Sequence, residues 1–301
     1  MRIRSCAAVL FTFLIITAVS LAATTVDGKG AMVLAHPKQA GAGQPFLVRL
    51  TSVRAFDKVF IRWMDREFVP SVSQWNGHHV AIAMLGTDVL TIKPGRQKLL
   101  VRAWAGGNET VWQRSVSIIG RTYPRQELNL PSKMVTPPTV ELKRIKSERA
   151  RTRKAKNTWS DQRLWRLPFH RPVEGKLTSV YGLQRVLNGK PKDPHRGLDF
   201  RAPVGTAVES VADGRVILAE SHYYAGNSMY IDHGNGVISL YFHLSKFDVF
   251  PGDVVKRGQI IGRSGCTGRA TGPHLHLSIS IQGRLVDPVP LFDDTIDQLL
   301  R

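Results

Sequence analysis

The segment His195-Arg-Gly-Leu-Asp199, followed 75 residues later by His274-Leu-His276, is the most informative part of this chain. Side chains two or four positions apart on a strand share a face, so each segment can present both of its polar groups on one side. Histidine nitrogens and aspartate oxygens are zinc ligands, and a catalytic zinc site uses three of them and keeps one position open. The two segments therefore predict a metal-dependent hydrolase, with these four side chains as possible ligands.

The first 22 residues differ from the rest of the chain. Arg2 and Arg4 precede an apolar run from Ala7 to Ala22, and small residues at its end suit cleavage. This pattern predicts a secretory signal peptide over residues 1–22. The alternative is an uncleaved membrane anchor, but the apolar run is short for a bilayer span. We therefore expect an exported protein of the periplasm or cell envelope, with no stable membrane span after cleavage.

The net charge of +19 predicts anionic partners. For an exported protein these are envelope polymers or anionic membrane surfaces. Nucleic acid is not expected, because the sequence carries no motif for reading it. Cys266 is the one cysteine left after signal cleavage, so no internal disulfide is expected. We expect Cys266 to be a buried structural thiol.

Residues 23–122 predict an immunoglobulin-like β sandwich, because short β-branched and aromatic segments alternate there with Gly and Pro turns. We expect three tryptophans of this region to belong to its core, although a sugar-stacking platform is an alternative. They are Trp63, Trp104 and Trp112. The expected strands are 46–50, 58–63, 80–84, 98–104 and 110–118.

Residues 123–165 predict a basic linker. The stretch 140–166 holds ten Lys/Arg against three Asp/Glu. One interpretation is a solvated, partly flexible tether, and the other is an electrostatic contact with an anionic envelope polymer. Residues 166–290 are again strand-rich, with a hairpin turn signal at Asn235-Gly236, and residues 291–301 form a short amphipathic tail.

The segment from about 168 to 290 resembles the lysostaphin/LytM-type zinc endopeptidases, which cut peptide cross-links of bacterial peptidoglycan. The residues before it resemble the β-sandwich domain that precedes the catalytic domain in some exported members. The motifs that carry the resemblance are Val180-Tyr-Gly182, Pro194-His-Arg-Gly-Leu-Asp-Phe200, Ala202-Pro-Val-Gly-Thr206, Tyr241-Phe-His-Leu244, Gly252-Asp-Val-Val-Lys-Arg-Gly258 and Gly265-Cys-Thr-Gly-Arg-Ala-Thr-Gly-Pro-His-Leu-His276.

The resemblance implies a division of roles among five side chains. His195, Asp199 and His276 match the ligands of one Zn²⁺ per chain, while His243 and His274 match two catalytic histidines that do not bind the metal. It also implies a tyrosine near the site, for which the candidates are Tyr181, Tyr223 and Tyr224. We expect His222 and His233, which fall in predicted loops, to be surface residues, and the remaining histidines to have no role in the site.

Together these observations predict an all-β protein: an immunoglobulin-like sandwich followed by a lysostaphin/LytM-type barrel-sandwich hybrid peptidase domain. The expected function is zinc-dependent hydrolysis of peptidoglycan cross-links, with the D-Ala–diaminopimelate bond favoured over a glycine bridge. The alternative is a non-catalytic wall-binding or amidase-activating module. The complete set of metal and histidine positions argues against that alternative.

Overall fold

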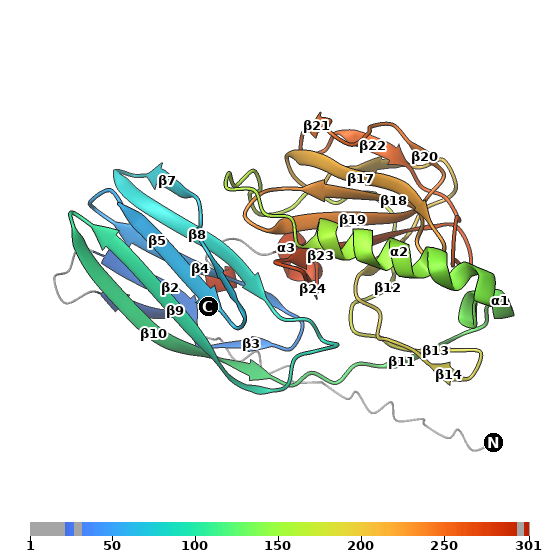
Figure 1. The fold of residues 1–301 in the computed structure, drawn as a ribbon, viewed down its shortest axis with the longest axis horizontal. Coiled ribbons are helices and arrows are strands. Elements are labelled where there is room, and N and C mark those ends of the chain that lie inside the picture. Colours follow the sequence, from blue (N-terminus) through green and yellow to red (C-terminus); the bar gives the residue numbers. More distant parts are fainter. Residues whose placement is uncertain (1–21, 27–31, 294–297, 301) are drawn as a thin grey trace, which may run out of the picture.

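The structure is a computed structural model that describes residues 22–26, 32–293 and 298–300. The predicted signal peptide lies outside the described residues, apart from Ala22 at the start of the first strand. Two β regions lie side by side along the long axis of the molecule (Figure 1). Strands dominate both regions, and the predicted all-β class is confirmed. No helix among the described residues is long and apolar enough to cross a membrane.

The N-terminal sandwich, residues 22–119, consists of two five-stranded sheets. The first sheet contains β1 (Ala22–Val26), β2 (Met32–Pro37), β4 (Pro45–Ser52), β8 (His78–Gly86) and β7 (Val72–Trp75) in that order. The second contains β3 (Gln39–Gly41), β10 (Asn108–Ile119), β9 (Gly95–Ala105), β5 (Lys58–Trp63) and β6 (Arg66–Phe68).

Two of the three tryptophans predicted for the core of the sandwich are there. Trp63 is fully buried edge-to-face against Phe46, and Trp112 is also buried. The prediction for Trp104 is wrong, because β9 alternates and the odd-numbered residues 99, 101 and 103 point inward. Trp104 is therefore on the outer face, where the Arg102 guanidinium lies 4.9 Å from its ring centroid.

Strand β8 is buried on both faces. Val80, Ile82 and Met84 belong to a hydrophobic cluster formed mainly by the C-terminal half of the chain, whereas Ala81, Ala83 and Leu85 belong to the core of the sandwich. An unbroken apolar run is typical of a strand covered on both sides. The two β regions therefore share apolar packing across β8. The domain boundaries expected at residues 122 and 165 stay a proposal.

The C-terminal region, residues 166–293, is built on one large sheet and a small one, and it contributes two short strands to a third sheet. The large sheet contains β12 (Leu177–Ser179), β15 (Leu198–Arg201), β23 (His274–Ile281), β19 (Val237–Leu244), β18 (Gly226–Asp232), β17 (Gly214–His222) and β21 (Val254–Val255), with β24 (Arg284–Val286) on β23. The small sheet contains β16 (Ala207–Glu209), β22 (Ile260–Arg263) and β20 (Lys246–Phe247).

The segment between the two regions is folded against the C-terminal region. Its first strand, β11 (Arg125–Leu128), pairs in parallel with β13 (Gln184–Leu187), which continues to β14 (Lys190–Pro191). Two helices follow, α1 (Ser132–Val135) and α2 (Thr139–Lys156), and α2 lies across β17 to β19 (Figure 1).

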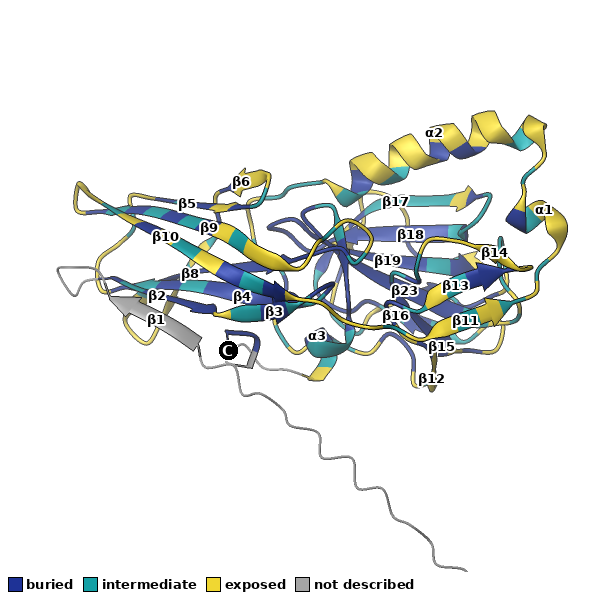
Figure 2. Cartoon of the chain, turned by 90° about the horizontal axis from the view of Figure 1, so that it is seen from below, coloured by how far each residue is buried: buried dark blue, intermediate teal, exposed yellow. Residues whose placement is uncertain are grey.

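Helix α2 presents a buried side to the sheet and an exposed basic side to solvent (Figure 2). Ala155 packs with an apolar patch on β18 and β19. The buried carboxylate of Glu148 accepts a hydrogen bond from the Tyr223 backbone N–H at 2.9 Å, and Arg151 donates one to Glu220 at 2.8 Å. These contacts show that the flexible-tether interpretation is wrong.

The C-terminal tail is also packed. Helix α3 (Val289–Asp293) and the 3₁₀ turn η1 (Gln298–Leu300) follow β24. Leu291, Leu299 and Leu300 are buried in the cluster that the two regions share.

Candidate metal centre and active site

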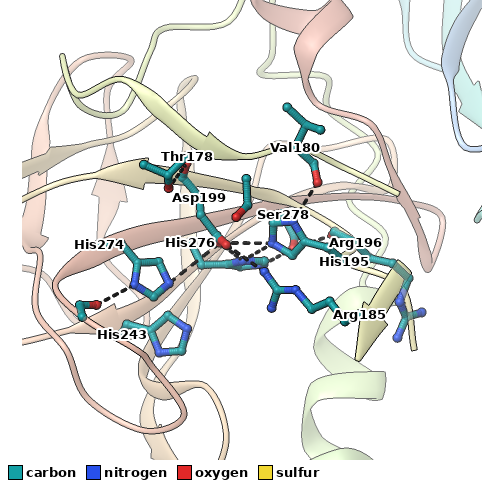
Figure 3. A network of polar contacts seen from close by, with 12 residues as sticks. Thr178, Val180, Arg185, His195, Arg196, Asp199, His243, His274, His276 and Ser278 are labelled. Atoms are coloured by element: carbon teal, nitrogen blue, oxygen red, sulfur yellow. Dashed lines mark hydrogen bonds and ion pairs between the residues drawn. The ribbon is translucent and has the colours of Figure 1, made fainter. Parts of the chain in front are cut away.

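Three of the predicted site residues converge where β15 meets β23. Asp199 and His276 are direct partners in the antiparallel ladder of these strands, and His195 lies in the loop that leads into β15. His195 Nε2 lies 3.0 Å from Asp199 Oδ1 and 3.0 Å from His276 Nδ1, and the latter two atoms are 2.7 Å apart. Figure 3 shows the three side chains pointing toward one another.

Gly197 makes this close approach possible. A Cβ at this position would lie 2.5 Å from the Leu277 carbonyl oxygen and 2.6 Å from His276 Nε2. Contacts this short are not tolerated, so any other residue would force β15 and β23 apart. The glycine in the His-Arg-Gly-Leu-Asp segment is therefore needed to bring His195 and Asp199 against His276.

Neighbouring groups determine which ring nitrogens carry hydrogen. His195 Nδ1 donates to the Val180 carbonyl at 2.8 Å, so its Nε2 presents a lone pair. The Ser278 hydroxyl donates to the Arg196 carbonyl and therefore accepts from His276 Nε2, which leaves His276 Nδ1 with a lone pair. Both histidines are thus oriented by hydrogen bonds from the nitrogen that faces away from the centre, as is typical of metal ligands.

Asp199 is oriented in the same way. Arg185 Nη2 donates to its Oδ2 at 2.8 Å, so Oδ1 faces the two histidine lone pairs. The Phe242 ring stacks on the His276 ring with an interplanar angle of 5° and holds its plane. Three lone pairs therefore meet within 3.0 Å, an arrangement that is repulsive unless a cation or a proton lies among them.

The donor set fits zinc. The residues His195, Asp199 and His276 are the one group of at least three such side chains in the described part of the chain whose donor atoms lie within 4.8 Å of one another. Two imidazole nitrogens and one carboxylate oxygen match the ligands of catalytic zinc sites, and bonds of about 2.0–2.2 Å reach all three atoms from one side. Three ligands leave the fourth position to the cleft.

His243 and His274 lie beside this group, with their ring centroids 4.7 Å apart. His243 Nδ1 donates to the Thr267 carbonyl at 2.7 Å, and His274 Nδ1 donates to the Gly272 carbonyl at 2.8 Å. Each ring therefore keeps a free Nε2 lone pair. His274 Nε2 is 3.8 Å from Asp199 Oδ1, close to the donor group but outside it.

Burial keeps two of the site histidines, His243 and His276, neutral. Burial, reinforced by His274 and His276, lowers the pKa of His243 to about 3. Burial also lowers the pKa of His276 to about 4. A neutral imidazole is the form that binds a metal, and it is also the form that accepts a proton. Both residues are therefore in the protonation state that their predicted roles require at neutral pH.

The structure separates the three tyrosine candidates. Tyr181 is fully buried, and its hydroxyl donates to the Leu285 carbonyl and accepts from the Val89 N–H, so it joins the two β regions and does not face the site. Tyr223 donates to the Lys133 carbonyl outside the cleft. Tyr224 lines a cavity together with His243 and His276.

Three other sequence expectations are wrong. Cys266 is exposed, because it lies in the turn that leaves β22. His222 and His233 are buried and not on the surface. His222 pairs with Glu220 at 2.8 Å, and His233 donates through Nδ1 to the Asp213 carbonyl at 2.7 Å. A histidine beside a turn can still point into the core, which loop position alone does not reveal.

The site opens into a cleft whose lining residues were not predicted from the sequence. A cavity of about 330 Å³ is lined by Asp199, His243 and His274. Its opposite wall includes Gln126, Leu128 and Leu130, which the connecting segment contributes through β11 and the residues after it. The parallel pairing of β11 with β13 brings this distant segment to the site, and the sequence did not predict that pairing.

The chain is similar to a known protein family and to a solved structure. Residues 193–288 match the family model described as peptidase family M23. A solved structure described as a putative peptidase M23 from Pseudomonas aeruginosa is 30% identical, covers 79% of this chain and 89% of its own, and gives a TM-score of 0.61.

Two curated relatives match about a third of the sequence. The peptidoglycan DD-endopeptidase ShyA of Vibrio cholerae is 51% identical over 94 residues, and the DD-carboxypeptidase/endopeptidase Mpg of Neisseria meningitidis is 46% identical over 95 residues. These matches cover 31% and 32% of this chain. The chain spans 22% of the length of each of these relatives.

Proposed function

Because the chain belongs to peptidase family M23, we propose that it is an exported zinc-dependent endopeptidase that hydrolyses peptide cross-links of bacterial peptidoglycan. One Zn²⁺ per chain is held by His195, Asp199 and His276. The convergence of three lone pairs within 3.0 Å carries this proposal, since it needs a cation and has the donor set of a catalytic zinc site.

The chemistry can be assigned to the residues of this chain. When bound, zinc supplies a Lewis acid that polarises a carbonyl and makes water a nucleophile at neutral pH. His243 and His274 place two unprotonated Nε2 atoms at the same cleft, because their Nδ1 hydrogens are held by backbone carbonyls. One accepts the proton of the attacking water on Nε2. The resulting Nε2–H, and the other histidine when it carries a proton on Nε2, can then donate to the negative charge that develops on the carbonyl oxygen.

The choice of peptidoglycan as substrate rests on three supports. Two of the relatives that match this sequence are named for cleavage of peptidoglycan or of D,D-peptide bonds. The predicted signal peptide would carry the chain to the periplasm or cell envelope. The net charge of +19 suits an anionic polymer, and nucleic acid is not proposed as a partner. Anionic envelope polymers are proposed partners of the basic side of α2, which is exposed along its length.

The test is digestion of purified sacculi by the zinc-loaded protein, with mass analysis of the released fragments. We expect loss of cross-links, with cleavage at the D-Ala–diaminopimelate bond. The variants His243→Ala and His274→Ala are the controls, because each should keep one equivalent of zinc while activity falls about 10²- to 10⁴-fold. Intact sacculi after treatment with the wild-type protein would contradict the proposal. The non-catalytic alternative predicts that result.

A further inference from the structure

Two arginines face the cleft beside the metal centre. Arg185 on β13 and Arg269 in the loop before β23 both line the three cavities that meet there, with volumes of about 330, 240 and 430 Å³. Arg185 also lies next to the centre itself, through its hydrogen bond to Asp199 (Figure 3). Both guanidinium groups thus border the space that a substrate would occupy.

The guanidinium of Arg269 has no anionic partner. This guanidinium makes no hydrogen bond or ion pair with any described residue. It makes a cation–π contact with Tyr224, in which Arg269 Cζ lies 4.5 Å from the ring centroid. Burial lowers the pKa of Arg269 below its ordinary value, and the charge of Arg185 acts in the same direction. A partly buried cation without an anion is costly in free energy, so its position at a cleft indicates an unoccupied ligand contact.

Arg185 contributes a second unused donor. Its Nη2 is bound to Asp199, but its Nε is buried and has no hydrogen-bond partner in the described part of the chain. Buried N–H groups are satisfied in most proteins, either by the protein or by what binds to it. Asp193, an acid whose charge acts on Arg269, is exposed and lies 4.0 Å from Arg196. Asp199 pairs with Arg185, so the positive charge without an ion-pair partner among the described residues is that of Arg269.

The position of Arg269 is held by the same loop that orients His243. The Thr267 carbonyl accepts from His243 Nδ1, and two residues later the Arg269 backbone N–H donates to the Tyr224 carbonyl at 2.7 Å. Gly226 and Gly268 let the two loops touch, since a Cβ on either would lie 2.3 Å from the facing loop. Arg269 is thus fixed beside a proposed catalytic histidine and is not a free surface side chain.

We propose that Arg185 and Arg269 form a carboxylate-binding subsite, which selects peptides carrying a free carboxylate on the residue next to the scissile bond. A carboxylate offers two coplanar oxygens, the arrangement that guanidinium groups bind best. This inference rests on the proposed endopeptidase function and specifies its substrate class. A D-Ala–diaminopimelate cross-link carries such a carboxylate, whereas a glycine bridge has none.

The experiment uses two synthetic cross-linked peptides that differ only in a carboxylate or a carboxamide at that residue. Binding is measured on the full-length, metal-free protein, where no cleavage occurs, and kcat/KM on the zinc-loaded protein. We expect the acid to be favoured at least tenfold in both assays, which corresponds to one charge-assisted hydrogen bond. In Arg269→Gln both ratios should fall toward one. The control Arg215→Gln removes an exposed arginine outside these cavities and should keep the wild-type ratios.

The two proposals fail in different ways. If the wild-type protein binds or cleaves both peptides equally, or if Arg269→Gln keeps the preference, the carboxylate subsite is wrong. Undetectable binding of both peptides also overturns it. If the acid peptide binds preferentially but neither peptide is cut by the zinc-loaded protein, the subsite stands and the endopeptidase function fails.

Discussion

The two β regions bury different kinds of side chain. In the N-terminal sandwich the buried polar or charged residues among those described are His36, Ser52, Thr87 and Asp88. The C-terminal region buries many more titratable groups, and they include His195, Asp199, His233, His243 and His276. Burying such groups costs free energy unless they are paired or bind a ligand. The comparison shows that one core serves mainly stability while the other is also built for chemistry.

One buried residue of the sandwich, Asp88, departs from this contrast between the two cores. Asp88 is a buried carboxylate of the sandwich, yet it accepts hydrogen bonds from the C-terminal region: from Arg196 at 3.1 Å and from the Leu285 N–H at 3.3 Å. The carbonyl of the same Arg196 accepts from Ser278, which orients His276. The sandwich thus supports the proposed metal centre through one of its few buried charges.

The largest expected effect comes from removing one large buried side chain from each core. His195→Ala should abolish zinc binding and activity, because two donors remain where catalytic sites use three. Trp63→Ala should lower the free energy of unfolding by about 3–5 kcal/mol and leave zinc at one equivalent. Metal analysis and urea unfolding measure the two quantities. One equivalent of zinc in His195→Ala would refute the ligand assignment.

A smaller effect on the free energy of unfolding should follow from lowering the pH, through protonation of His233. Burial lowers the pKa of His233 to about 4, below the ordinary value of 6.5. The unfolded chain therefore binds the proton more readily, and stability is lost as pH falls from about 6.5 toward 4. The loss from this group approaches about 3 kcal/mol.

The measurement compares urea unfolding at pH 7 and pH 4.5 for the metal-free wild-type protein and His233→Gln. The variant should lose less stability between these pH values, since its side chain does not titrate. Equal losses in the two proteins would show that His233 does not contribute to acid sensitivity. Burial also lowers the pKa of His36 in the sandwich, so each of the two cores holds a buried histidine that opposes folding in acid.

The smallest effect should come from the contact between the regions. Asp88→Asn removes the charge that holds Arg196 and should lower the free energy of unfolding by about 1–3 kcal/mol. It should also weaken zinc binding, by up to about tenfold, because Asp88 acts on His276 through Arg196 and Ser278. The matched control is Glu67→Gln, which breaks the exposed pair with Arg62 and should change little. Equal effects of the two variants would contradict the supporting role of Asp88.

Much of the fold could be predicted because local patterns determine it. The strand expected at 58–63 coincides with β5, and the Asn235-Gly236 hairpin turn has positive φ at both residues. Period-two spacing likewise placed Asp199 and His276 on strands that prove to be neighbours. The proximity of five polar side chains follows from the resemblance and is present in the structure. Their roles stay predictions.

What could not be predicted depends on contacts between distant segments. The composition of α2 is that of a solvated helix, yet Glu148 and Ala155 anchor it to the sheet. Leu128 and Leu130 reach the cleft only because β11 joins β13. The prediction for Trp104 fails for a different reason: a tryptophan in a sandwich usually lies in the core, but the register of the alternating strand β9 places Trp104 on the outer face.

Strand β8 has a consequence for how the molecule unfolds. Since its two faces belong to the cores of different regions, neither core can melt without exposing apolar surface of the other. The two regions should therefore act as a single cooperative unit with one thermal transition. A fragment that begins after the sandwich would expose an uncovered hydrophobic face and tend to aggregate. The catalytic half of this chain is consequently best regarded as an inseparable part of a larger folding unit.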